Sequence, residues 1–235
     1  MYNQFCPIAK AAEILGEKWT ILILREILIG AHRFNEIQRG LGDISPALLT
    51  SRLKSLEGQG MIVKRQIPGQ RGYEYYPTEA CENLMPVLLS LGEWGLCWAR
   101  HMILDEDFDV EFLMTYLERS IDPSKLPGKE TVIRFHFTDL TEQQDYWIVV
   151  QGERVEMCLK DPGRDVHVFF TCTLRAMHDV WMGDRTYKQA VTDGDMIIQG
   201  EPALTRNVRA WLKPSVFEEA KRVPIPGGVA MSAGV

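Results

Sequence analysis

The chain has 235 residues, of which 46% are hydrophobic and 25% are charged, as expected of a globular protein with room for two cores. No run approaches the ~20 apolar residues of a membrane span, and the charged residues near the start are unlike a signal peptide. We therefore expect a cytoplasmic protein with no membrane partner. The five cysteines lack ligand spacing, so we expect reduced thiols, no metal site and no cofactor.

The net charge of −6 is distributed unevenly along the chain. Residues 1–100 contain 11 Lys and Arg against 10 Asp and Glu, whereas residues 101–235 contain 15 against 22. Between Ala31 and Arg71 there are seven basic residues and three acidic ones. Phosphate binding requires a local positive field of this kind, so the sequence favours nucleic acid as the partner of the N-terminal half.

Three helices are predicted before residue 45. Residues 7–16 and 18–28 have helical apolar patterns, and the second is so rich in aliphatic side chains that we expect it to be buried scaffold. Phe34, Ile37 and Leu41 recur at helical spacing and predict a short third helix.

A fourth helix and a β-hairpin are predicted next. Ser45 is a good N-cap, Pro46 suits the first helical position, and leucines form an apolar seam opposite small polar residues. Two short strands flank turn residues 68–72. A helix with a polar outer face followed by a basic hairpin is how a winged helix reads DNA. The candidate DNA contacts are Arg33, Ser45, Ala47, Thr50, Ser51, Arg52, Lys54, Arg65, Gln70 and Arg71.

Each part of this region also fits a role that does not involve DNA. The fourth helix could be an ordinary amphipathic helix with its polar side in solvent, and the charges of the hairpin could serve only to keep the protein soluble. The charge concentration and the spacing between helix and hairpin favour DNA binding over both alternatives.

After residue 78 a long apolar helix is predicted, with Pro86 as a kink or restart. Its apolar surface is wider than one face packed on its own domain requires, so we expect it to pair with a second copy of the chain. The candidate dimerisation residues are Leu84, Leu88, Leu91, Trp94 and Trp98.

The second half changes to an apolar period of two, and the overall fold class predicted is α+β. Four segments between residues 132 and 172 predict an antiparallel meander, followed by helices, a strand near residue 196 and one closing helix over 203–212. We predict a DNA-binding and dimerisation domain at 1–103, a linker with a short helix at 104–129, an α+β domain at 130–213 and a flexible tail at 214–235.

Residues 6–102 resemble the HxlR-type winged-helix transcriptional regulators. The matching elements include Cys6-Pro7, residues 16–20 (GEKWT), 33–37 (RFNEI), 44–46 (ISP), 49–53 (LTSRL) and 73–78 (YEYYPT). The resemblance implies a dimeric DNA-binding bacterial regulator with its fourth helix in the major groove. Two-fold symmetry of the dimer would demand a pseudo-palindromic operator. The sequence shows no catalytic triad, P-loop or dinucleotide-binding motif, so we do not expect an enzyme. The resemblance also implies a possible role for Cys6, since the cysteine here senses oxidants in some members; packing against the dimer helix is the alternative.

The second half resembles sterol-carrier-protein-like domains through residues 182–184 (MGD), Ala190 and 194–201 (GDMIIQGE). This resemblance implies an apolar cavity between sheet and helices, and hence a hydrophobic small-molecule partner. Ordinary core packing is the alternative role of the candidate lining residues, which are Phe135, Phe137, Met157, Trp181 and Met196. At the level of the whole chain, the alternative to a regulator is a small-molecule carrier or sensor whose winged helix serves dimerisation or protein contact.

Overall fold

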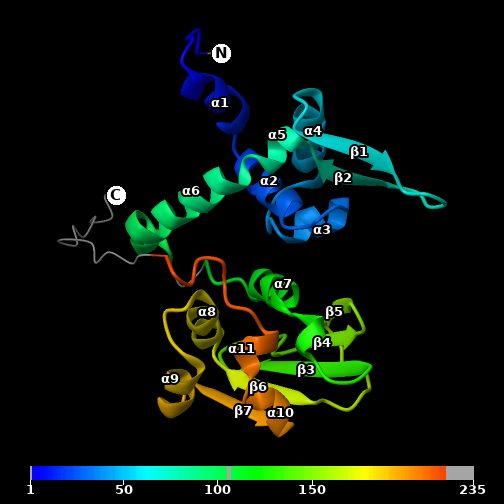
Figure 1. Cartoon of the computed structure of the whole chain (residues 1–235), viewed down its shortest axis with the longest axis vertical. Coiled ribbons are helices and arrows are strands. Elements are labelled where there is room, and N and C mark those ends of the chain that lie inside the picture. Colours follow the sequence, from blue (N-terminus) through cyan, green and yellow to red (C-terminus); the bar gives the residue numbers. More distant parts are fainter. Residues whose placement is uncertain (1, 105–106, 221–235) are drawn as a thin grey trace. The chain divides into compact units, whose positions relative to one another are not determined.

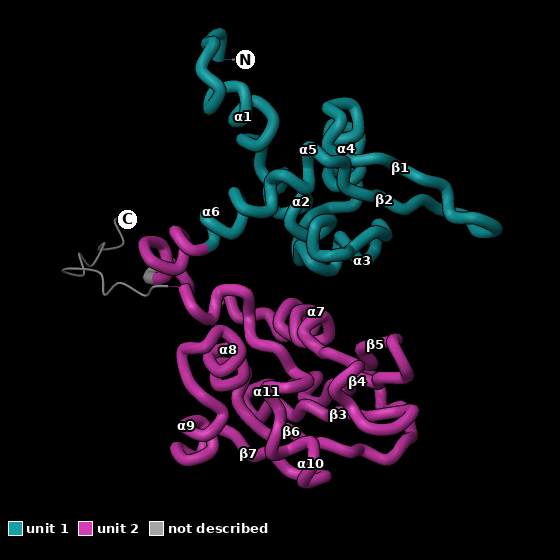
Figure 2. Tube along the Cα trace, in the orientation of Figure 1, with its two compact units in different colours: residues 1–92 teal, residues 93–235 magenta. Residues whose placement is uncertain are grey.

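The computed structural model describes residues 2–104 and 107–220. The chain forms two compact units, residues 1–92 and 93–235, and the boundary falls within helix α6 (Met85–Trp98) (Figure 2). The domain bounds expected from the sequence stay a prediction. The expected tail reaches beyond the described residues at 221–235, while Ser215 is buried and its backbone N–H donates to the Trp181 carbonyl at 2.9 Å.

The first unit is a set of helices with one β-hairpin (Figure 1). Trp19 precedes the second helix in a left-handed conformation, with φ of +79°. The elements are α1 (Pro7–Leu15), α2 (Thr20–Leu28), α3 (Phe34–Arg39), α4 (Pro46–Gly58), β1 (Ile62–Gln66), β2 (Tyr73–Pro77), α5 (Glu79–Glu82) and the first part of α6.

One apolar core holds α2, α3, α4 and the hairpin together. Ile23, Leu24 and Ile27 from α2 pack with Ile37 from α3, as the sequence pattern predicts for the buried scaffold helix. Glu26 is also fully buried on α2, and its carboxylate lies against Gly40 at the end of α3. A side chain at this position would have to displace the buried carboxylate.

The second unit is a five-stranded sheet with helices. Besides the last part of α6, its elements are η1 (Arg100–Met102), α7 (Val110–Ser120), η3 (Pro123–Lys125), β3 (Glu130–Phe137), β4 (Asp145–Gln151), β5 (Arg154–Cys158), β6 (Val168–Cys172), α8 (Leu174–Met182), α9 (Tyr187–Thr192), β7 (Met196–Gly200), α10 (Pro202–Thr205) and α11 (Val208–Trp211). The mixed α+β class is therefore as predicted, but the single closing helix is in fact two short ones separated at Arg206 and Asn207.

The sheet is mixed, which corrects the prediction of an antiparallel sheet and a four-strand meander. Its order is β5-β4-β3-β6-β7, and β6 pairs with β3 in parallel, while the other neighbouring pairs are antiparallel. Residues 159–167 therefore form a crossover instead of a hairpin turn. The reason is a second apolar face: Val132, Trp147 and Val149 are buried there, and Val166 of the crossover packs against them.

The main core of the second unit lies on the other side of the sheet. Ile133 pairs with Ile148, and Ile148 pairs with Met157, so successive strands present one continuous apolar face. Met177 and Trp211 from α8 and α11 belong to the same core, so these helices pack on this face of the sheet. Helix α7 lies within the segment 104–129 and also contributes to this core, through Leu113, Met114 and Leu117.

Candidate nucleic-acid interface

Helix α4 is specified at its start and along its inner side by different residues. Ser45 Oγ accepts a hydrogen bond at 3.3 Å from the backbone N–H three residues on, and Pro46 takes the first position, where no N–H is needed. Leu49, Leu53 and Leu56 are buried in the core of the first unit. The opposite side of α4 is therefore left to solvent or to a partner.

Four of the candidate contacts share this outward side. Ala47, Thr50, Ser51 and Lys54 are all exposed and recur at intervals of three or four residues. Thr50 Oγ1 donates to the carbonyl of Pro46 at 2.8 Å, so the hydroxyl is oriented by its own helix. We call these four residues the outer face of α4; it offers small groups, hydroxyls and one ammonium.

Arg52 does not lie with the outer face. Its Nε donates to the carbonyl of Lys18 at 3.2 Å, and its guanidinium forms an ion pair with Glu17. Its side chain is only 23% exposed. The arginine that the sequence suggested as a DNA contact is thus engaged with the turn between α1 and α2.

Arg33 precedes α3 and is held beside the hairpin. It forms an isolated β-bridge with Glu74, and its Nε lies 3.5 Å from Oε1 of that carboxylate. The Glu36 carboxylate accepts the backbone N–H of Arg33 at 2.9 Å and that of His32 at 3.0 Å. The Tyr76 hydroxyl, and then Arg33, lower the pKa of Glu74, so this carboxylate stays ionised beside the guanidinium.

The hairpin strands present their cations over aromatic rings. Lys64 Nζ lies 3.9 Å from the centre of the Tyr73 ring, and the Arg65 guanidinium lies 5.0 Å from that of Tyr76. Arg65 is directly opposite Glu74 in the strand register. Both cations are exposed and remain accessible to an anionic partner.

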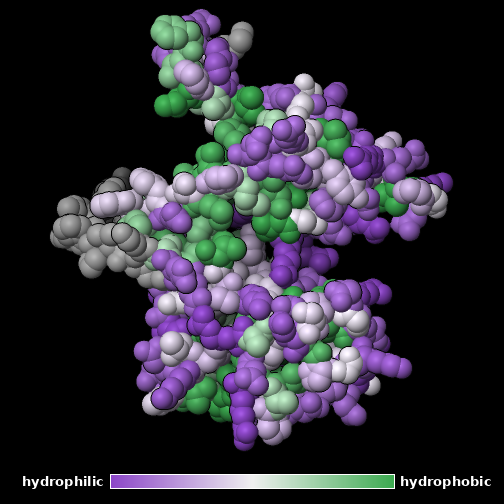
Figure 3. Space-filling view, viewed as in Figure 1, coloured by the Kyte–Doolittle hydropathy of each residue, from purple (hydrophilic) through white to green (hydrophobic). Residues whose placement is uncertain are grey.

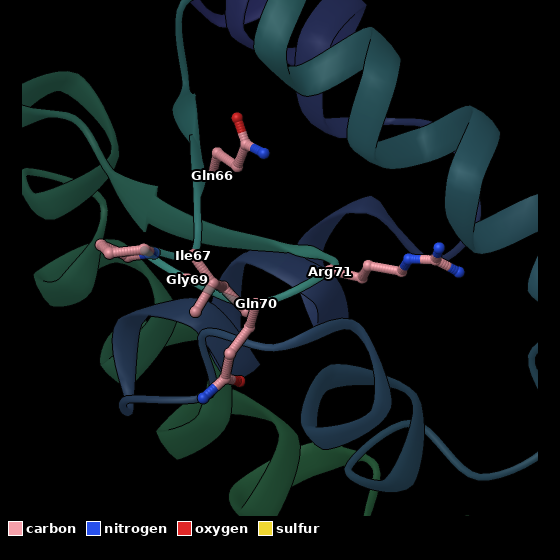
Figure 4. Close-up of a pocket in the computed structure, with 6 residues that line it drawn as sticks. Gln66, Ile67, Gly69, Gln70 and Arg71 are labelled. Atoms are coloured by element: carbon pink, nitrogen blue, oxygen red, sulfur yellow. The ribbon is translucent and has the colours of Figure 1, made fainter.

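The loop at the tip of the hairpin, residues 66–71, lines a hollow that is open to solvent. Gly69 has φ of +70°, a left-handed conformation that favours glycine in this turn. In Figure 4 the side chains of Gln66, Gln70 and Arg71 extend from the loop in different directions. Gln70 and Arg71 are exposed, as a phosphate contact from a wing requires.

The hairpin and α6, the helix that contains the boundary between the two units, differ in the hydropathy of their surfaces. Figure 3 shows hydrophilic residues gathered over the hairpin and hydrophobic residues along α6. Leu91, Trp94 and Trp98 of α6 are 46%, 59% and 50% exposed. Leu84 packs against the first core and Leu88 is half-buried, so the five dimerisation candidates do not form one uniformly exposed stripe.

Cys6 lies immediately before α1 and is half-buried. Lys10, the cation that follows one helical turn later, directs its ammonium to Glu13 at 3.1 Å. None of the five cysteines, all of which the structure describes, is in a disulfide. The structure therefore offers a thiol at the start of α1, while the neighbouring ammonium is engaged elsewhere.

The candidate ligand residues of the second unit are engaged in packing. Phe135, Phe137 and Met196 are buried, and the Phe135 ring is stacked on Phe170 with centroids 4.9 Å apart. Met157 and Trp181 are half-buried at the edge of the same core. Within the described residues, no group of three or more His, Cys, Asp or Glu side chains is arranged to hold a metal ion. Nor, across residues 2–104 and 107–220, does any helix combine the length and hydropathy needed to cross a membrane.

Two carboxylates at this interface were missed by the sequence analysis. Glu17 contacts Arg52 and Glu74 contacts Arg33, so each holds a candidate DNA-binding arginine. A pattern of basic residues does not show which carboxylates pair with them. A useful signal was available for Glu74, because an acid in the middle of a basic hairpin needs a nearby cation.

Part of this chain is similar to known proteins. The family described as HxlR-like helix-turn-helix matches residues 14–102. The uncharacterized HTH-type transcriptional regulator YvaP of Bacillus subtilis is 34% identical over 105 residues, covering 44% of this chain and 97% of YvaP. YdeP of the same organism, described in the same words, is 36% identical over 93 residues, covering 38% of this chain and 71% of YdeP. The reduced form of the B. subtilis transcriptional regulator YodB is 28% identical, with 42% of this chain and 98% of YodB covered and a TM-score of 0.37.

Proposed function

The chain belongs to the HxlR-like helix-turn-helix family, and from this premise we propose that it is a cytoplasmic bacterial transcriptional regulator, not an enzyme, that binds duplex DNA with α4 in the major groove. The outer face of α4 is the observation that carries the proposal. Its small side chains allow the helix backbone to approach base edges closely, and its hydroxyls and ammonium can bond to bases or phosphates.

The hairpin supplies the second part of the DNA contact. Arg65, Gln70 and Arg71 are exposed on or beside the wing, and Arg33 is held at its base. These side chains suit the phosphate backbone or the minor groove, where contacts fix the register of the protein on the duplex without reading sequence. Arg33 must exchange part of its contact with Glu74 for a phosphate, so we assign it a weaker role than Arg71.

We further propose a homodimer formed through α6. Leu91, Trp94 and Trp98 leave large apolar surfaces exposed in the single chain, and burial against a second copy would remove them from water. A two-fold dimer that binds one face of the duplex places its recognition helices ~34 Å apart, which demands a pseudo-palindromic operator.

The second unit is proposed to carry a hydrophobic small molecule, as its resemblance to sterol-carrier-like domains implies. A mixed sheet with helices over one apolar face supports the proposal. Because Phe135 and Phe137 already contact other aromatic rings, a guest must displace side chains at the edge of the core, where Met157 and Trp181 are half-buried. To regulate DNA binding, the guest must also bind two states of the protein unequally.

Selection of duplexes from a randomised pool tests the proposed function, followed by titration of the selected duplex across a series of salt concentrations. We expect a two-fold symmetric consensus and a linear fall of log affinity with log salt. Titration with dodecanoate, monitored by tryptophan fluorescence and by binding to the selected duplex, tests the ligand part. A fluorescence response without DNA binding would instead favour a carrier whose winged helix serves dimerisation or protein contact.

A further inference from the structure

Glu17 and Arg52 connect the turn before α2 to the middle of α4. The guanidinium has five donors in a fixed plane, and here it reaches both the Glu17 carboxylate and the Lys18 carbonyl, the latter at 3.2 Å from Nε. The two side chains are 35 positions apart in sequence. The contact therefore holds α4 against an element that lies outside the helix-turn-helix and the wing.

The turn that receives Arg52 has an unusual backbone. Trp19 is a non-glycine residue with φ of +79°, a conformation that costs free energy and persists only where neighbouring contacts fix it. The Thr20 N–H donates to the Glu17 carbonyl at 3.1 Å, and the Trp19 ring packs against the first core. Because the Lys18 carbonyl directly precedes Trp19, the bond from Arg52 joins α4 to a turn that is already constrained.

Arg52 also occupies a defined angle on α4. It follows Ser51 of the outer face and precedes Leu53 of the buried seam, so it lies at the border between the two sides. The leucine seam allows small rotations of the helix, since apolar contacts are not directional. A polar contact at the border restrains that rotation, and it thereby fixes where the outer face points.

The geometry points to a positioning role for Glu17 and Arg52: the pair fixes the rotation of α4 so that Thr50, Ser51 and Lys54 meet the base edges, and Arg52 itself contacts no base. This inference deepens the proposed function and rests on it. In this role the Glu17 carboxylate contributes to the DNA sequence selectivity of the protein, although a carboxylate by itself repels phosphate. Removing Glu17 is therefore expected to weaken selectivity although it removes a negative charge.

The test compares Glu17→Gln, Arg52→Gln and the double variant with the native protein. Each is titrated with the duplex selected by the native protein and with a scrambled duplex of equal length, over a series of salt concentrations. We expect each single variant to lower the ratio of selected to scrambled affinity by about three- to ten-fold. The double variant should be no worse than either single one, because both lose the same contact, and the salt slope should be unchanged.

Glu13→Gln is the matched control, since Glu13 is another acid near the N-terminus but contacts Tyr2 and Lys10 instead of α4. It should leave the selectivity ratio unchanged. A direct phosphate contact by Arg52 predicts a different pattern: Arg52→Gln lowers the salt slope by about one, and Glu17→Gln leaves the ratio unchanged or raises it. That pattern would overturn the inference, as would unchanged ratios in both single variants. If Arg52→Gln fails to fold, Glu17→Gln alone decides, because it retains the arginine.

Failure of the inference and failure of the proposed function give different results. If the native protein selects duplexes and the variants select them equally well, only the positioning role is refuted. If the native protein prefers no duplex, both the proposed DNA-binding function and the inference are refuted.

Discussion

Cys81 illustrates how burial controls a single ionisable group. Its side chain is fully buried in the first core, and burial, followed by the charge of Glu82, raises the pKa of the thiol from 9.0 to about 11. Burial likewise raises the pKa of the Cys172 thiol to about 12 in the second unit. Both thiols are therefore neutral at physiological pH.

This shift makes stability depend on alkaline pH. Between pH 9 and about 11 the unfolded chain loses the Cys81 proton while the folded chain retains it, so the free energy of unfolding falls as pH rises. Cys81→Ala removes the thiol, so its free energy of unfolding should lack this pH dependence. The native protein should therefore lose more stability than the variant between pH 8 and pH 10.5, and the difference in the free energy of unfolding between them should become smaller. Urea unfolding of both proteins at the two pH values measures it. An equal difference at both values would contradict the assigned pKa.

For single residues, the sequence predicts exposure to solvent more reliably than it predicts the partners of a side chain. Ala47, Thr50, Ser51 and Lys54 are exposed as the helical pattern predicts. The engagement of Arg52 was not predictable, because its partners lie in a turn 34 and 35 positions away. A pattern within one helix carries no information about such distant contacts.

The cap of α4 provides a prediction at the scale of one element. Ser45→Ala removes the acceptor for an N–H in the first turn and should lower the free energy of unfolding by about 1 kcal/mol. Ser55→Ala is the matched control, because Ser55 is an exposed serine inside the same helix and alanine is a better helix former there. Urea unfolding of the three proteins gives both values. Equal losses in the two variants would show that Ser45 has no capping role.

Local signals predicted most elements, but they did not determine how the strands pair. Thr173 caps α8 and Thr186 caps α9, and threonine is a residue type that favours this position. The segment around Pro162 and Gly163 has the composition of a turn, yet it belongs to the crossover that takes the chain to β6. Composition identifies a break between strands, whereas the pairing depends on which apolar face the connection must cover.

The proposed dimer depends on the exposed apolar side chains of α6. Trp94→Asp places a charge among exposed apolar residues of α6, so it should convert a micromolar dimer into a monomer and reduce DNA affinity. Sedimentation velocity of the native protein and the variant measures the change. Leu159 provides a control, since it is 45% exposed in the crossover after β5, away from α6 in the sequence, and Leu159→Asp should leave the dimer intact. A monomeric native protein, or a Trp94→Asp variant that remains dimeric, would exclude α6 as the interface.

The most direct test of DNA binding through α4 and the wing is the affinity of a Lys54→Ala/Arg71→Ala variant for the selected duplex. Lys188→Ala/Arg206→Ala removes the same charges from exposed positions of the second unit and serves as the control. We expect DNA binding to lose about 1–3 kcal/mol for each removed contact and the salt slope to fall by about one for each lost phosphate contact, while the control keeps native affinity. A folded Lys54→Ala/Arg71→Ala variant with native affinity and salt slope would contradict it.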